Sequence, residues 1–124
     1  MRLLLDTHVV LWALSGSRIS KQARTAIAEP ENTVLLSAAS VWEVSIKQGL
    51  GRLTLPEHWL DAAQEQGIEI LPITAEHALA VGDLPSHHRD PFDRMLIAQA
   101  RIEGLTLVTR DPRLVEYDVS VLSA

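Results

Sequence analysis

Short apolar runs recur along the chain, and each is closed by a polar residue or a turn signal. Continuous apolar runs of this length are typical of strands that are buried on both faces of a parallel sheet. The pattern predicts strands at Leu3–Asp6, Thr33–Ser37, Ile68–Leu71 and Leu105–Val108, with a short edge strand at Val119–Leu122.

The segments between these runs carry helix start and stop signals. Ser20 is a good N-cap, Pro91 fits a first helical position, and Gly104 fits the position after a helix end. Strands that alternate with helices favour the α/β class, and we expect a three-layer α/β/α architecture with a central parallel sheet in one domain over residues 1–124. The predicted helices are Thr7–Leu14, Ser20–Glu29, Ala38–Gln48, Pro56–Gln66, Thr74–Val81 and Asp90–Glu103.

The composition excludes several classes of function. The absence of cysteine removes disulfides, thiolate catalysis and cysteine-ligated zinc, and it fits a reducing cytoplasm. The longest apolar run, Val9–Leu14, has six residues and is far too short to span a membrane. Asp6 and His8 interrupt what could have been a signal-peptide core. We therefore expect a cytoplasmic protein with no membrane segment.

Four acidic residues carry the main functional signal. Each stands where a strand or turn leads into a helix, and the set is Asp6, Glu43, Asp93 and Asp111. Ligand sites in open parallel sheets lie beyond the carboxyl ends of the strands. If the acids converge there, the pocket needs a cation, and hard oxygen ligands suit Mg²⁺ or Mn²⁺.

The net charge of −5 by itself argues against nucleic acid, whose binders usually have a basic surface. Bound metal changes this interpretation, because the charge of an ion belongs in the electrostatics of its site. Two divalent cations would bring the formal charge to −1.

Each acid also has an ordinary structural alternative. Asp6 can cap the helix that follows it, and Asp111, which precedes a proline, can begin a turn. Glu43 has Lys47 four residues later, a spacing that gives exposed helical ion pairs. The residues on either side of Glu43 are apolar, so we expect its carboxylate to face a partner in the protein or a ligand and not open water.

Residues beside the acids can support the site. Asp90 fits an N-cap, and Asp93 fits the first turn of the same helix, where an acid favours the helix dipole. Thr7 and Thr109 can orient a carboxylate or a metal-bound water, or can be ordinary threonines at strand ends. The adjacent His87 and His88 match no zinc motif, and we expect both on a surface loop.

Several strings of the sequence together resemble one family. This resemblance runs from about residue 1 to 122, and its strings are Leu4–Leu14, Ser40–Lys47, Gly51–Leu53, Arg89–Ala100 and Leu105–Asp111. The chain resembles a PIN-domain ribonuclease of the VapC type, which is the toxin of a type II toxin–antitoxin pair.

The resemblance implies a PIN-like fold, an RNA phosphodiester substrate, a small antitoxin protein as partner and a homodimer. The family's four acids fall on the four named above, and its hydroxyl residue before the last acid falls on Thr109. Lys47, Arg94 and Arg110 lie near the acids in sequence. They are candidates for contacts with the RNA backbone, and the alternative is that they pair with the acids.

Apolar residues are numerous around the second half of the helix at 38–48. Some of them can form a groove for a partner peptide, since large exposed apolar patches usually mark an interface, although several must belong to the core. The set is Trp42, Ile46, Leu50, Leu53, Leu55, Trp59 and Leu60. From the resemblance, a basic residue of the partner would reach the acids.

Two other functions stay open at this stage. One is an RNA-processing or repair nuclease with the same site. The other is a receiver-like phosphoacceptor module, which also gathers acids and Mg²⁺ at a parallel sheet edge. Receiver-like domains pair acids after the first strand and place a lysine after a late strand, whereas here Asp6 stands alone and the late position holds Arg110 and Asp111.

Overall fold

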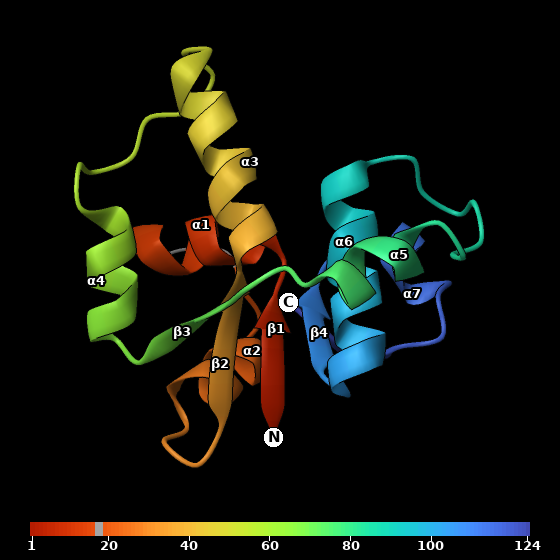
Figure 1. Cartoon of the computed structure of the whole chain (residues 1–124). Helices are drawn as coiled ribbons and strands as arrows, with labels where there is room; N and C mark the ends of the chain where they lie inside the picture. Colours follow the sequence, from red (N-terminus) through yellow and green to blue (C-terminus); the bar gives the residue numbers. More distant parts are fainter. Residues whose placement is uncertain (17–18) are drawn as a thin grey trace.

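A parallel sheet forms the centre of the molecule (Figure 1). The computed structural model describes residues 1–16 and 19–124, and within them the sheet has five strands in the order β3-β2-β1-β4-β5. The strands are β1 (Arg2–Leu5), β2 (Thr33–Ser37), β3 (Ile68–Leu71), β4 (Thr106–Thr109) and β5 (Ser120–Ser123). All neighbouring strands pair in parallel, so the predicted fold class and the edge position of the last strand are confirmed.

Helices connect the strands. They are α1 (Thr7–Ser15), α2 (Lys21–Ala28), α3 (Ala38–Gly49), α4 (Trp59–Glu65), α5 (Ala75–Val81), α6 (Pro91–Glu103) and α7 (Pro112–Val115). The predicted start of α4 at Pro56 is wrong, because Pro56 lies in a turn that its carbonyl closes with the N–H of Trp59. The short α7 is absent from the helices predicted above, although Asp111 stands where a strand is expected to lead into a helix.

The sheet is covered on both faces because residues alternate along its strands. Leu3 and Leu5 of β1 pack into one cluster with Val9 of α1 and Ala23 of α2. Leu4 faces the other way and packs with residues of α6 and α7. The sheet and the helices on its two faces therefore form three layers, as expected. None of the helices described is long and apolar enough to cross a membrane.

The carboxyl ends of the central strands meet at one edge of the sheet. β1 lies between β2 and β4, and all three run in the same direction. Helix α3 begins directly after β2. Helices α1 and α7 begin within three residues of the ends of β1 and β4. The chain therefore brings three helix N-termini and their capping side chains to this edge, beside the first turn of α6 (Figure 1).

Candidate active site

Asp6 directly follows β1, and its carboxylate is buried with two partners. Oδ1 accepts from the N–H of His8 at 3.2 Å, so Asp6 caps α1. Oδ2 accepts from the hydroxyl of Thr109 at 2.7 Å. Thr109 also accepts from the N–H of Asp111 at 3.1 Å. Capping and a place in the site are thus compatible for Asp6, and Thr109 connects two of the predicted acids.

Glu43 lies on α3, and only 5% of its surface is exposed. Its Oε1 accepts from the hydroxyl of Thr7 at 2.9 Å, and that hydroxyl is also hydrogen-bonded to Ser40 at 2.8 Å. Its Oε2 accepts from Lys47 Nζ at 2.8 Å. The helical ion pair is therefore present, but the carboxylate in it is buried and held from both sides.

Asp90 and Asp93 sit at the start of α6 with different roles. Asp90 Oδ1 accepts from the N–H groups of Phe92 and Asp93 at 2.8 and 3.3 Å, so the expected capping role of Asp90 is found. Burial, followed by the negative charges of Asp6, Asp90, Glu43 and Asp111, raises the pKa of Asp93 from 3.8 to about 7. Asp93 therefore lies within the electric field of all the other predicted acids.

Asp111 caps α7 and is paired with the side chain of Arg113, a residue that the sequence did not single out. Its Oδ1 accepts from the backbone N–H of Arg113 at 2.9 Å. The Arg113 guanidinium donates to Oδ1 at 3.2 Å and to Oδ2 at 3.0 Å. These side-chain hydrogen bonds are the main reason why the pKa of Asp111 is lowered. An i, i+2 spacing across a helix start gives no periodic signal, so Arg113 was missed.

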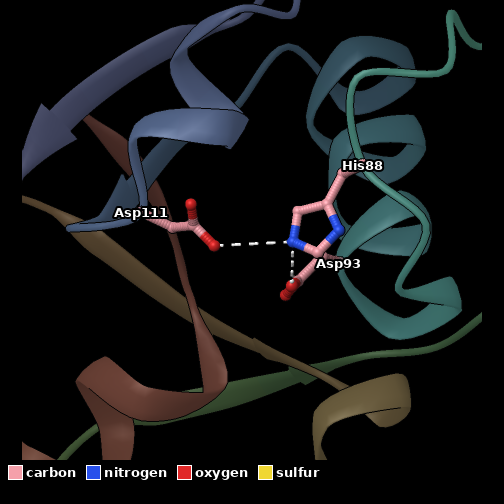
Figure 2. Close-up of side chains that lie close together, drawn as sticks. All are labelled: His88, Asp93 and Asp111. Atoms are coloured by element: carbon pink, nitrogen blue, oxygen red, sulfur yellow. Dashed lines mark ion pairs between the residues drawn. The ribbon is translucent and has the colours of Figure 1, made fainter.

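The prediction of two surface histidines is wrong for His88. Its side chain is 5% exposed, and Nε2 lies 3.0 Å from Asp93 Oδ2 and 3.4 Å from Asp111 Oδ2 (Figure 2). His87 points elsewhere and is partly exposed beside Glu116. The two histidines are adjacent in sequence but have different partners, so adjacency alone does not give them a common environment.

The site fits a divalent cation by its donor chemistry. The ligand atoms of His88, Asp93 and Asp111 all lie within 4.8 Å of one another. Burial, and then the neighbouring carboxylates, raise the pKa of Asp93, and a bound cation would oppose both effects. Asp6 and Glu43 do not belong to this compact group, but their charges contribute to that shift. Hard carboxylate oxygens suit Mg²⁺ or Mn²⁺.

The three predicted RNA contacts lie in different surroundings. Lys47 is 38% exposed while it pairs with Glu43, so it lies at the margin of the site. Arg110 stacks over the ring of Trp12 at 4.3 Å and donates to the backbone oxygen of Ala124. Neither of these two partners of Arg110 is one of the four acids.

Arg94 contacts the end of α5 and the loop before α6, and its predicted contact with RNA stays a prediction. Its guanidinium donates to the carbonyls of Val81, Leu84, Pro85 and His88, and it lies 3.4 Å from the hydroxyl of Tyr117. A planar fork with several donors suits this role, because it satisfies many loop carbonyls at once. Arg94 organises the loop that presents His88, a role for which sequence spacing gives no signal.

His8 is a further basic residue at the site that sequence reasoning missed. Its ring lies 3.9 Å from Asp6 Oδ1 and is 58% exposed. The carboxylate of Asp6 beside the ring raises the pKa of His8. The margin of the site therefore carries the cations Lys47 and Arg113 and the basic residue His8 around the acids.

The apolar residues expected around α3 divide into two groups. Trp42, Ile46 and Leu50 are exposed, at 60%, 40% and 61%, and they follow one another at i, i+4 spacing. Trp59 is buried. The others pack against the core and are Leu53, Leu55 and Leu60. We call the three exposed residues the α3 stripe. It begins next to Glu43, where Trp42 meets Phe92 edge to face at 5.1 Å.

Comparison with known proteins agrees with this fold. The PIN domain family model matches residues 3–120 of the chain. Ribonuclease VapC22 of Mycobacterium tuberculosis is 34% identical over 116 residues, which cover 90% of this chain and 88% of that protein.

Two solved structures extend the comparison to three dimensions. VapBC2 from Rickettsia felis, bound to a promoter DNA fragment, gives a TM-score of 0.75 at 17% identity over 99% of this chain and 98% of that one. FitAcB from Neisseria gonorrhoeae gives a TM-score of 0.67 at 27% identity, with 97% and 96% covered. The chain belongs to the PIN-domain family and is a member of VapC type.

Proposed function

We propose that the chain is a divalent-metal-dependent endoribonuclease that acts in the cytoplasm as the toxin of a toxin–antitoxin pair. The observation that carries the proposal is the position of Asp93, whose partly buried carboxyl lies among the charges of Asp6, Glu43, Asp90 and Asp111. Family membership and the relative named a ribonuclease support the reaction class. A receiver-like module would need paired acids after the first strand and a lysine after a late strand, whereas here Asp6 stands alone and the late position holds Arg110 and Asp111.

The roles of the residues follow from their contacts. Asp6, Glu43, Asp93 and Asp111 would hold Mg²⁺ or Mn²⁺, which when bound activates water and stabilises the leaving oxygen of a phosphodiester. Thr109 fixes one oxygen of Asp6, and Thr7 fixes one oxygen of Glu43. These hydrogen bonds orient the carboxylates before any substrate arrives, so little reorganisation is required.

Lys47 would bind the RNA backbone. Its ammonium stands at the margin of the acid cluster and is partly exposed, so it can contact a phosphate while it stays near Glu43. We expect single-stranded or loop RNA to be preferred, because an exposed backbone bends more easily into a buried site than a duplex does.

Cleavage of defined RNA tests the function directly. Purified protein with Mn²⁺ should cut a single-stranded RNA, and Asp93→Asn should lose at least about a hundredfold in rate, as expected when one group of a catalytic set is removed. Asp61→Asn is the matched control, because Asp61 is 70% exposed on α4 and outside the acid cluster. Equal activity of the two variants would refute the assignment. Phosphorylation by acetyl phosphate without RNA cleavage would favour the receiver-like module.

The α3 stripe would bind the antitoxin. Exposed apolar side chains in a row along one helix fit the apolar face of a partner segment. Structures of VapBC2 and FitAcB resemble this chain in fold. The partner would be a small protein that covers Trp42, Ile46 and Leu50 and reaches the adjacent acids with a basic side chain. The homodimer implied by the resemblance stays a prediction, which light scattering of the purified protein would test.

A further inference from the structure

His88 has a buried ring nitrogen, Nε2, that lacks a hydrogen-bond partner among the described residues. Among the residues that the structure describes, Nε2 has no partner with good hydrogen-bond geometry, although two carboxylate oxygens lie 3.0 and 3.4 Å away. A buried polar atom without a partner is costly, so its position requires an explanation. Figure 2 shows this nitrogen facing both Asp93 and Asp111.

The other ring nitrogen decides which atom carries the proton. His88 Nδ1 accepts from the backbone N–H of Asp90 at 3.0 Å. An acceptor nitrogen must offer its lone pair, so Nδ1 carries no proton. In a neutral imidazole the proton is then on Nε2. The ring therefore presents an N–H donor to the acids.

This tautomer separates two roles that the distances alone allow. By distance, His88, Asp93 and Asp111 form a possible metal triad. A histidine that ligates through Nε2 must offer a lone pair there and usually donates its other N–H to an acceptor. His88 has the opposite arrangement, since its Nδ1 receives a hydrogen from the main chain. An Nε2–H group cannot ligate a cation.

The loop that carries His88 is fixed by residues from other elements. The N–H of His88 donates to the Tyr117 hydroxyl at 2.9 Å, and its carbonyl accepts from Arg94 at 3.3 Å. The Tyr117 hydroxyl in turn donates to the carbonyl of Pro85 at 3.1 Å. With both main-chain groups and Nδ1 engaged, the direction of Nε2 is set before any ion binds.

We propose that His88 is a positioning residue whose Nε2–H faces the Oδ2 atoms of Asp93 and Asp111 and attracts both, so that the two carboxylates turn toward one cation without His88 becoming a ligand. The inference rests on the proposed function because it assumes that the acids bind a metal ion. The hydrogen bonds and distances around His88 do not depend on that function. Hydrogen bonds to ligating carboxylates typically contribute tenfold to hundredfold in metal affinity.

Nitrogen-15 NMR of the wild-type protein tests the tautomer. The two ring nitrogens give separate signals that depend on which one carries the proton. His88→Gln identifies the His88 signals by their loss. We expect the Nε2–H form in metal-free protein and the same form after saturation with Mg²⁺, which is diamagnetic. Transfer of the proton to Nδ1 on addition of Mg²⁺ would make His88 a ligand and overturn the proposal.

Calorimetric titration with Mg²⁺ tests the positioning role. His88→Ala should weaken Mg²⁺ binding about tenfold to hundredfold, and His88→Gln should keep part of the affinity, because an amide N–H can reach the same carboxylates. His87→Ala is the matched control, since His87 pairs with Glu116 outside the acid cluster. Melting curves establish which variants are folded at the titration temperature. Unchanged Mg²⁺ affinity in His88→Ala would overturn the proposal.

The two proposals fail in distinguishable ways. If the protein binds Mg²⁺ with the expected His88 dependence but cuts no RNA, the proposed function fails and the positioning role stands. If RNA is cut in a metal-dependent way while His88→Ala binds Mg²⁺ like the wild type, the positioning role fails alone. Should His88→Ala not fold, His88→Gln and the wild-type tautomer still decide the question.

Discussion

The hydroxyl of Thr109, the last residue of β4, donates a 2.7 Å hydrogen bond to Oδ2 of Asp6, the residue after β1. The same hydroxyl accepts from the N–H of Asp111. Because β1 and β4 are parallel neighbours, this single side chain ties two acids that are far apart in sequence to one edge of the sheet. The geometry of the acids therefore depends on a buried neutral residue.

Replacement of Thr109 by valine should reduce both activity and stability. Valine has the same shape but leaves Oδ2 of the buried Asp6 without its donor, which costs about 1–3 kcal/mol in the free energy of unfolding. Urea denaturation and the rate of RNA cleavage measure the two effects. Thr106→Val on the same strand is the control, because Thr106 is more exposed and has no role at the site. Wild-type cleavage by Thr109→Val would show that Asp6 needs no such support.

Asp93→Asn should leave the metal-free protein at least as stable as the wild type near neutral pH. The folded pKa of Asp93 is raised from 3.8 to about 7, so between these values the native state binds more protons than the unfolded chain. The titration of Asp93 therefore lowers the free energy of unfolding as pH rises from about 4 to 7. This decrease reaches about 4 kcal/mol at most. Asparagine has no charge and removes that loss.

Thermal melting at several pH values, with and without Mn²⁺, checks this sign. The wild type should gain stability from Mn²⁺ by mass action, and Asp93→Asn should gain less. Below about pH 4 the metal-free proteins should differ little, because Asp93 is then protonated in both states. A metal-free variant that melts well below the wild type at pH 7 would mean that Asp93 acts mainly in the first turn of α6.

Lys47 and Arg94 should respond differently to replacement by glutamine. Lys47→Gln should weaken binding of single-stranded RNA and reduce its salt dependence, with a modest loss of stability, because Lys47 is partly exposed but its removal takes a charged donor from the buried carboxylate of Glu43. Arg94→Gln should cost about 2–4 kcal/mol in unfolding free energy, since it removes charged hydrogen bonds to several loop carbonyls. RNA titrations at increasing salt and urea denaturation distinguish them. A stable Arg94→Gln that has lost only RNA affinity would support the prediction made from sequence.

Replacement of Trp42 or Ile46 by aspartate should weaken binding of the partner protein. A charge in the middle of the α3 stripe must be desolvated when the interface forms, so affinity for the cognate partner should fall at least tenfold. Leu79→Asp is the control, because Leu79 is 78% exposed on α5. In cells, co-expression of the partner should restore growth for the wild type and the control but not for stripe variants that still cut RNA. Full rescue of the stripe variants would place the interface elsewhere.

The elements and the four acids were within reach of sequence reasoning because their signals are local. Strand runs, caps such as Asp90 and helix-ending Gly104 each depend on a few neighbouring residues. Parallel strands then bring acids at strand ends to one edge without knowledge of any side-chain contact.

The missed features depend on contacts between segments. His88 is buried because Tyr117 and Arg94 fold its loop onto the start of α6, and no periodicity in the loop predicts that. Arg94 looked like an RNA contact because it follows an acid, but its donors are used by carbonyls of the chain. Proximity in sequence to an acid does not determine which way a long cationic side chain turns.

The metal requirement of RNA cleavage tests the central claim most directly. Single-stranded RNA should be cut by the purified protein with Mn²⁺, left intact after thorough EDTA treatment, and cut again when Mn²⁺ is returned in excess. The restored rate should rise with Mn²⁺ to saturation in the wild type and stay near background in Asp93→Asn. Cleavage that survives EDTA, or that Asp93→Asn performs like the wild type, would contradict a nuclease site built from these acids.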